Sequence, residues 1–354
     1  MISFYPGPSQ VYPQVPDYVR DAYEQGVLSI NHRSPEFVTI SSRAIALIKE
    51  KLNVPADYTV FFTSSSTECW EIISQSLVEQ NSFHVYNGAF GQKWYQYAQK
   101  LQPEAKGQAF DLQETLPVDA LTVEEGTELI ALTHNETSNG TALSQDTLRA
   151  VRERFRKPLI AVDATSSLAG VALPIEQADV WYASVQKCFG LPAGLAVMLC
   201  SPRTIERAQQ IGENQHYNSL LFMNEKIQVQ QTTYTPNVLG IYLLMRTLEQ
   251  RARINDVDQL LQARFQRWID VISQRNDIRL LIDNPAVRSL TVVPFTAGKP
   301  TIDQIRQAAK EQGMILGNGY GPWKATSLRI ANFPALADPE INQLIRFLTT
   351  YSPS

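Results

Sequence analysis

The sequence predicts an α/β protein whose main domain is built on a mainly parallel, mixed sheet with helices on both faces. Short apolar, β-rich runs alternate with segments of helical spacing over most of the chain, and such alternation is typical of parallel strands joined by crossover helices. The C-terminal part repeats a shorter strand–helix pattern, which predicts a small α+β domain. We therefore expect a large domain over residues 1–250, with an N-terminal arm, and a small domain over residues 251–354.

Composition excludes several classes of function. The 354 residues are 44% hydrophobic and 19% charged, as in compact globular proteins, and the net charge of −4 provides no basic field for nucleic acid. No apolar run approaches the roughly 18 to 20 residues of a membrane span. The three cysteines have no pairing pattern and the four histidines no metal-ligand spacing. We expect a cytoplasmic protein with no metal, membrane or nucleic-acid partner.

The individual elements follow from local pattern. Residues 4–8 contain two prolines and a glycine, which predict an extended arm. A proline at the first position of a helix is favourable, so Pro236 is expected to open a long helix. The predicted strands of the large domain are 59–62, 83–86, 128–132, 158–162, 179–183 and 195–200, and those of the small domain are 289–295 and 327–331. The main predicted helices are 16–25, 37–52, 68–78, 144–155, 201–210, 257–274, 301–312 and 339–349, with one more starting near residue 91.

Polar side chains follow the ends of four predicted strands. They belong to the segments 64–67 and 135–137, to Asp163, and to the loop that carries Lys187. Ligands of open parallel sheets bind beyond the carboxyl ends of the strands. The shared placement of these residues predicts one site at that edge of the sheet.

Lys187 lies at the centre of a loop of small residues, glycine and proline between two apolar strands. Burying an ammonium group is costly, so a lysine in such a loop is typically kept neutral to act as a nucleophile. A Schiff base with pyridoxal phosphate is the commonest use of such an amine. The alternative is a surface lysine in a connecting loop.

Four other features have a functional and a structural interpretation. The hydroxyl-rich turn at residues 63–67 precedes a helix and is either an anion site or a simple N-cap. Trp94 either packs in the core or lies on a planar cofactor. The His32-Arg33 pair either binds an anion or is a solvated turn. Arg329, flanked by Leu and Ile in a predicted strand, is either an edge-facing charge or an anion ligand at a domain cleft.

Taken together, the motifs resemble those of the class V aminotransferases, over nearly the whole chain and in the same order. The resemblance is strongest at His32-Arg33-Ser34 and at Gln186-Lys187 followed by Gly190-x-Pro-Ala-Gly194. Further matches are Phe4-Tyr-Pro-Gly-Pro8, Trp94, Asn135-Glu-Thr137-x-x-Gly140, Asp163-x-x-Ser166-Ser167 and Thr235-Pro236. Within the family, the sequence looks most similar to the members that act on O-phosphoserine.

The resemblance implies an enzyme of pyridoxal-phosphate fold type I that works as a homodimer, with the site at the subunit interface. It implies that Lys187 forms the Schiff base, that Asp163 pairs with the pyridine nitrogen, that Thr137 bonds the ring hydroxyl, and that Trp94 stacks on the ring. The cofactor phosphate would be held by Ser66, Thr67 and Gln186, and by Thr235 of the neighbouring subunit.

The substrate residues also follow from the resemblance. Arg329 would bind the substrate α-carboxylate, and His32 and Arg33 would lie near the acidic side chain. The expected reaction moves an amino group between O-phosphoserine and 2-oxoglutarate, as amino-acid and 2-oxo-acid substrates, in serine biosynthesis.

Two segments depart from the family pattern. The phosphate-binding turn is hydroxyl-rich at residues 63–67 where the family has glycines, and hydroxyls also suit a phosphate. The segment Gly319–Lys324 replaces a second His-Arg pair typical of enzymes for O-phosphoserine, and Lys324 offers only a point charge in its place. An alternative is therefore a class V transaminase for an unphosphorylated amino acid, of the alanine/serine–glyoxylate or serine–pyruvate type.

Two further classes fit less well. A cysteine desulfurase or lyase of the same fold would need a mobile nucleophilic cysteine, but Cys200 lies in a predicted strand and Cys188 adjoins Lys187. A non-catalytic nucleotide-binding protein would need a glycine-rich phosphate loop, and neither a Gly-x-Gly-x-x-Gly after the first strand nor a P-loop occurs.

Overall fold

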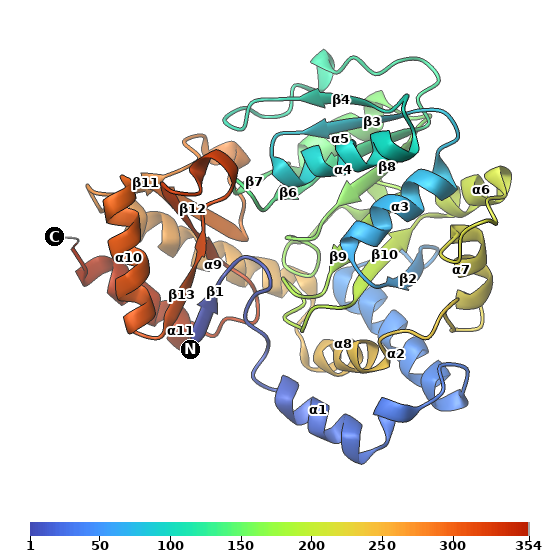
Figure 1. Cartoon of the computed structure of the whole chain (residues 1–354), viewed down its shortest axis with the longest axis horizontal. Helices are drawn as coiled ribbons and strands as arrows, with labels where there is room; N and C mark the ends of the chain where they lie inside the picture. The colour runs from blue at the N-terminus through green and yellow to red at the C-terminus, as the bar shows by residue number, and fades with distance from the viewer. Residues whose placement is uncertain (353–354) are drawn as a thin grey trace.

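The fold is organised around a seven-stranded sheet in which one strand runs against the others. The computed structural model describes residues 1–352 (Figure 1). The strand order is β2-β10-β9-β8-β5-β3-β4, and β10 is antiparallel to both of its neighbours while the other neighbouring pairs are parallel. The prediction of a mainly parallel, mixed sheet is confirmed. The strands are β2 (Thr59–Thr63), β10 (Ala196–Cys200), β9 (Val180–Ser184), β8 (Leu159–Asp163), β5 (Leu129–Thr133), β3 (Ser82–Tyr86) and β4 (Lys106–Ala109).

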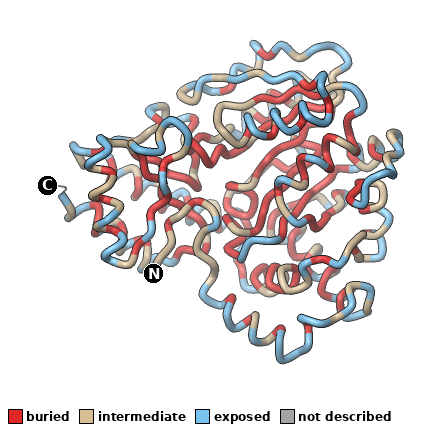
Figure 2. The backbone as a smooth tube through the Cα atoms, viewed as in Figure 1, coloured by how far each residue is buried: buried red, intermediate tan, exposed pale blue. Residues whose placement is uncertain are grey.

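Both faces of this sheet are covered because the central strands are apolar on both sides. Alternate residues of β8 belong to two different cores: Ile160 and Val162 to the larger one, Leu159 and Ala161 to the smaller. The larger core contains side chains of α2 (Pro35–Leu52), α5 (Gln145–Arg154), α8 (Val238–Gln250) and α1 (Val15–Glu24). The smaller contains side chains of α3 (Ser66–Leu77), α4 (Ala89–Leu101), α6 (Pro202–Ile211) and α7 (Leu220–Ile227). Figure 2 shows the buried strands between these exposed outer helix surfaces.

A second sheet of five strands lies beside the first and includes the start of the chain (Figure 1). Its order is β1-β13-β14-β12-β11, and β1 pairs in parallel with β13, Ile2 opposite Met314. The members are β1 (Ile2–Phe4), β13 (Met314–Asn318), β14 (Ser327–Ala331), β12 (Val292–Thr296) and β11 (Arg279–Leu280). The helices of this part are α9 (Ile254–Ser273), α10 (Lys299–Glu311) and α11 (Asp338–Thr350).

The expected boundary between domains falls in the short connection between α8 and α9. We propose two domains divided there, with β1 counted in the second, because its hydrogen-bonded neighbour is β13. The arm that follows β1 then leads back to the first domain. None of the helices within residues 1–352 combines the length and the apolar character that crossing a membrane requires.

Some elements differ locally from the expectations. Pro236 does not open α8: the helix begins at Val238, and the Asn237 side chain caps it by accepting from Gly240 N. The segment after β5 forms a small hairpin of β6 (Asn135–Glu136) and β7 (Thr141–Ala142). This hairpin carries one of the polar motifs that the sequence places at the sheet edge.

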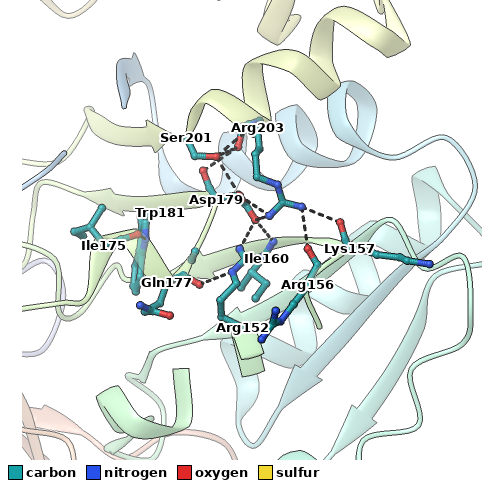
Figure 3. A network of polar contacts seen from close by, with 12 residues as sticks. Arg152, Arg156, Lys157, Ile160, Ile175, Gln177, Asp179, Trp181, Ser201 and Arg203 are labelled. Carbon is teal, nitrogen blue, oxygen red and sulfur yellow. Dashed lines mark hydrogen bonds and ion pairs between the residues drawn. The ribbon is translucent and has the colours of Figure 1, made fainter. Parts of the chain in front are cut away.

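A buried carboxylate, that of Asp179, holds the amino-terminal end of β9 in place (Figure 3). Asp179 is 3% exposed and accepts from Ile160 N at 2.8 Å and Ser201 Oγ at 3.1 Å. Arg152 and Arg203 also donate to it, and Arg203 Nη1 lies 3.2 Å from Asp179 Oδ1. The network joins the beginnings of β8 and β9 to α5 and α6, away from the carboxyl ends of the parallel strands, and we interpret it as structural.

Candidate active site

A cavity of about 430 Å³ lies where the carboxyl ends of the parallel strands meet the N-terminal arm and the second sheet. Residues 5–8 of the arm, the beginnings of α3 and α4, and the ends of β5, β8 and β9 form its wall. Tyr320 and Arg329 border it from the second sheet and the loop before β14. The cavity therefore brings together segments from both ends of the chain.

Lys187 is buried in this cavity, with 8% of its surface exposed. Its Nζ donates to Thr137 Oγ1 and to Ser166 Oγ, both at 2.8 Å. Burial lowers the pKa of the Lys187 amine to about 8, although the carboxylates of Asp163 and Glu136 act in the opposite direction. The amine is thus held by two hydroxyl acceptors and is partly neutral near physiological pH, as a nucleophile or base requires.

Asp163 ends β8 and lines the same cavity, 6% exposed. Burial raises the pKa of its carboxyl, while hydrogen bonds from Thr165 and Tyr182 and the charge of Lys187 oppose the rise. The bond from Thr165 N to Oδ1 measures 2.9 Å. The carboxylate is fixed in place by donors and has a strong tendency to pair with a protonated partner.

Hydroxyl groups gather at the N-terminus of α3. Ser66 Oγ lies 2.8 Å from both Ser184 Oγ and Thr165 Oγ1, and Thr67 lies beside it on the cavity wall. Gln186 also lines the cavity, and its side-chain NH2 group can donate to an anion. Hydroxyls and free amides at the positive end of a helix suit a phosphate group.

Arg329 lies on β14 with 4% of its surface exposed and faces the cavity. Its Nε donates to Asn318 O and its Nη1 to Thr137 O, both at 2.7 Å. These two bonds fix the plane of the guanidinium. A fixed, buried guanidinium on a cavity wall is suited to binding a carboxylate.

The aromatic ring beside Lys187 is Phe90 and not Trp94. The Phe90 ring centroid lies 5.5 Å from Lys187 Nζ, and Phe90 lines the cavity. Trp94 is 2% exposed and does not line the cavity; it is stacked on Trp70 at 6.5 Å and edge-on to Tyr182 at 5.3 Å. Trp94 comes one helical turn later, about 6 Å further from the sheet edge. The expectation that Trp94 stacks on a cofactor ring is therefore wrong.

Four residues that the sequence suggests for the site are not brought to the cavity of this single chain. Arg33 is exposed and donates to Gln231 Oε1 at 2.9 Å, and neither it nor the half-buried His32 borders the cavity. Thr235 is exposed and also lies outside the cavity wall. Lys324 is exposed and does not replace the absent His-Arg pair at this cavity.

Sequence reasoning assigned no role to several residues that line the cavity or bond its walls. Ser166 bonds Lys187, Ser184 bonds Ser66, and Lys93 and Tyr320 border the opening beside Phe90. The sequence could have indicated Phe90. It lies in the first turn of the helix that follows a strand, and such a turn lies at the carboxyl end of the strand, where the site is expected. No comparable local signal exists for Tyr320, which reaches the cavity from the second sheet.

The cavity fits pyridoxal phosphate on its own chemistry. Besides Gln186 Oε1, the buried atoms Asn135 Nδ2 and Thr133 Oγ1 have no partner within the described residues, and both residues line the cavity. Buried polar groups are rarely left unsatisfied, so these atoms indicate a polar ligand. An amine, a carboxylate, a hydroxyl cradle and an aromatic face are all present for it.

Comparison with known proteins agrees with this chemistry. The model of the class V aminotransferases matches residues 3–324. A phosphoserine aminotransferase of Corynebacterium glutamicum is 27% identical over 96% of this chain and 91% of that protein. The crystal structure of a phosphoserine aminotransferase from Cytophaga hutchinsonii is 32% identical and covers 98% of both chains, with a TM-score of 0.94.

A more distant structure shares the fold alone. An aspartate aminotransferase from Thermus thermophilus covers 99% of this chain and 98% of that chain, with a TM-score of 0.87 at 20% identity. The fold is therefore that of the pyridoxal-phosphate-dependent aminotransferases, as the sequence predicted. With a family model that matches most of its length and a cavity that provides the required lysine and carboxylate, the chain belongs to the class V aminotransferases and is a pyridoxal-phosphate-dependent enzyme.

Proposed function

We propose that the enzyme transfers an amino group between O-phosphoserine and 2-oxoglutarate, the step that yields phosphoserine in serine biosynthesis. The observation that supports it most is the likeness to the Cytophaga hutchinsonii phosphoserine aminotransferase over 98% of both chains. Relatives with the same printed name, from Corynebacterium and Nocardioides, are 27% and 26% identical over at least 90% of this chain.

The roles of the cofactor-binding residues follow from their positions in the cavity. Pyridoxal phosphate, when bound, supplies an electron sink for the bond cleaved at the substrate α-carbon. We assign Asp163 to the ring nitrogen, Thr137 to the ring hydroxyl and Phe90 to the ring face. Ser66, Thr67 and Gln186 would hold the phosphate at the N-terminus of α3.

Lys187 has two tasks in this proposal. Its amine would hold the cofactor, and it would also move a proton to and from the substrate α-carbon as general base and acid. The hydroxyls of Thr137 and Ser166, each 2.8 Å away, keep the amine directed into the cavity. Arg329 would bind the substrate α-carboxylate and so orient the α-hydrogen toward this amine.

We propose further that the active enzyme is a homodimer in the cytoplasm. A second subunit would bring His32, Arg33 and Thr235 to the cavity, since each is at least partly exposed and away from the cavity of its own chain. Mixing Lys187→Ala and Arg33→Met variants tests this arrangement. Neither variant alone should be active, whereas mixed dimers contain one intact site and should recover activity; no recovery after subunit exchange would argue against a shared site.

A half-reaction tests the substrate. The holoenzyme is mixed separately with O-phosphoserine, serine and alanine, and the loss of the cofactor's visible absorbance is followed. We expect fast conversion by O-phosphoserine and much slower conversion by the others. Conversion by serine or alanine, with O-phosphoserine inert, would overturn the proposal.

The second candidate is a transaminase for an unphosphorylated small amino acid, of the alanine/serine–glyoxylate or serine–pyruvate type. The segment Gly319–Lys324 favours it, because this segment replaces the second His-Arg pair with Tyr320 and an exposed lysine. The same half-reaction separates the two candidates.

A further inference from the structure

Lys93 is a cation at the cavity wall to which the proposed chemistry assigns no task. It lies on α4, three residues after Phe90, and its Nζ donates to Tyr320 Oη at 2.8 Å. The amine also lies 5.6 Å from the centroid of the Phe90 ring and 5.4 Å from that of Tyr320. Lys93 is therefore tied to a residue of the other sheet region across the cavity opening.

The charges on the cavity wall are unbalanced. Three cations, Lys93, Lys187 and Arg329, face it, against the single carboxylate of Asp163. Lys187 and Asp163 act on the cofactor, and Arg329 is assigned to the α-carboxylate. Within residues 1–352, Lys93 has no carboxylate at ion-pair distance, so its charge is available to an anion in the cavity.

Tyr320 lies close to both of the remaining cations. The guanidinium carbon of Arg329 lies 5.6 Å from the Tyr320 ring centroid, and Lys93 Nζ lies near the same ring and bonds its hydroxyl. One amino-acid substrate in the cavity can therefore meet both cations beside this ring. Two cations on one cavity wall match a substrate that carries two anionic groups.

We propose that Lys93, positioned by the Tyr320 hydroxyl, binds the second anionic group of the substrate. That group is the phosphate of O-phosphoserine and, in the other half-reaction, the γ-carboxylate of glutamate. The inference rests on the proposed function, which it deepens by assigning the distal group a cation from this chain. It also gives the segment Gly319–Lys324 a task, because that segment supplies Tyr320.

Single-turnover half-reactions of the holoenzyme with O-phosphoserine, glutamate and alanine test the proposal. We expect Lys93→Met to lower the selectivity for O-phosphoserine over alanine about tenfold or more, the usual size of one charge-assisted contact. Lys93→Arg should keep part of this selectivity, and Tyr320→Phe should lower the selectivity less than Lys93→Met does. The matched control is Lys100→Met on the same helix, whose Nζ lies 4.5 Å from the Tyr97 ring but outside the cavity wall.

The outcomes separate this inference from the proposed function. If the wild-type enzyme uses O-phosphoserine and Lys93→Met keeps the wild-type selectivity, the inference is wrong and the proposed function stands. If O-phosphoserine is inert but Lys93→Met lowers selectivity for glutamate over alanine, the proposed function fails and the second-anion contact stands. If Lys93→Met lowers the half-reaction rate equally with all three substrates, Lys93 only supports Phe90. That result would overturn the inference.

Discussion

The lowered pKa of Lys187 leads to a prediction that can be tested without enzyme turnover. When the cofactor is removed, the rate at which the protein takes up pyridoxal phosphate should depend on the neutral fraction of this amine. Because burial lowers the pKa to about 8, the rate should rise with pH up to that value and then level off. An ordinary lysine would keep gaining reactivity to above pH 10.

The size of the effect follows from the two pKa values. At pH 7.5, roughly a quarter of the molecules carry a neutral Lys187 amine, against about one in a thousand for an ordinary lysine. The rate constant should therefore exceed that of a lysine model compound by at least about 200-fold at this pH, before any gain from orientation. Below pH 7 each pH unit should cost about a factor of ten.

The neighbours of Lys187 set the direction of two further shifts. The cation of Arg329 lowers the pKa of Lys187 and the anion of Asp163 raises it. Arg329→Met should therefore move the midpoint to higher pH, and Asp163→Asn should move it to lower pH. Opposite shifts in these two variants exclude a general change in the accessibility of the cavity.

The assay is stopped-flow absorbance between pH 6 and 10 with a fixed cofactor concentration. N-acetyl-lysine methylamide, mixed with the same cofactor solution, corrects for the titration of the cofactor itself. A rate that climbs tenfold per pH unit through pH 9 and beyond, with no plateau near 8, would refute the argument that burial keeps Lys187 partly neutral.

Three further predictions separate the roles of individual residues. Phe90→Ala should weaken cofactor retention about tenfold, measured by dialysis. Trp94→Ala should instead lower the free energy of unfolding of the apoprotein by about 3–5 kcal/mol, measured in urea. If Trp94→Ala lost the cofactor and Phe90→Ala only lowered stability, Trp94 and not Phe90 would contact the cofactor ring. Asp163→Asn should lower kcat by about 10²-fold or more with the cofactor still bound, because the ring nitrogen loses its anionic partner, and an unchanged kcat would refute the assignment. Asp179→Asn should lower the free energy of unfolding by about 3 kcal/mol and leave kcat per folded molecule unchanged, since its contacts to Arg152 lie in the network away from the cavity; loss of kcat alone would contradict that view.

Local sequence pattern was sufficient for six of the seven strands of the large sheet and for the position of Lys187, but it missed β4, whose residues are mostly exposed and form no apolar run. A buried strand needs a run of apolar residues, and its carboxyl end must turn into a loop, so polar residues directly after such runs meet at one edge. Asp163 and Thr137 reach the cavity for that reason. The direction of β10, the sheet's one antiparallel strand, could not be predicted from its own residues, because a run of apolar residues suits a parallel or an antiparallel strand equally.

The misplacement of Trp94 has a geometric cause. Phe90 and Trp94 are four residues apart and so lie on the same face of α4. Helical periodicity alone therefore cannot tell which ring borders the cavity. The difference is depth along the helix axis, which depends on where α4 begins: the expected start near residue 91 is two residues later than the observed start at Ala89.

Contacts between distant segments were beyond sequence reasoning. Lys93 and Tyr320 are 227 residues apart, and no periodicity relates them. The pairing of β1 with β13 joins segments that are even farther apart in the sequence, and it anchors the start of the arm that crosses the cavity next to Lys187. A Cβ on Gly7 would lie 2.8 Å from Lys187 Cε, at a φ of +147°, so the arm approaches the lysine this closely only because the residue is glycine.

The β6–β7 hairpin contacts α4, Lys187 and Arg329, and so connects three parts of the site. Glu136 is 1% exposed, and its Oε2 accepts from Phe90 N and Gly91 N at 3.1 Å, while Oε1 accepts from Ser138 N at 2.9 Å. The next residue, Thr137, accepts from Lys187 Nζ through its hydroxyl and from Arg329 through its carbonyl. Two consecutive residues thus set the positions of the aromatic face, the reactive amine and the guanidinium relative to one another. A buried carboxylate that accepts three backbone donors cannot be replaced by an amide without leaving a donor unpaired, so the acidic residue of this motif is explained by the placement of α4 and needs no part in proton transfer.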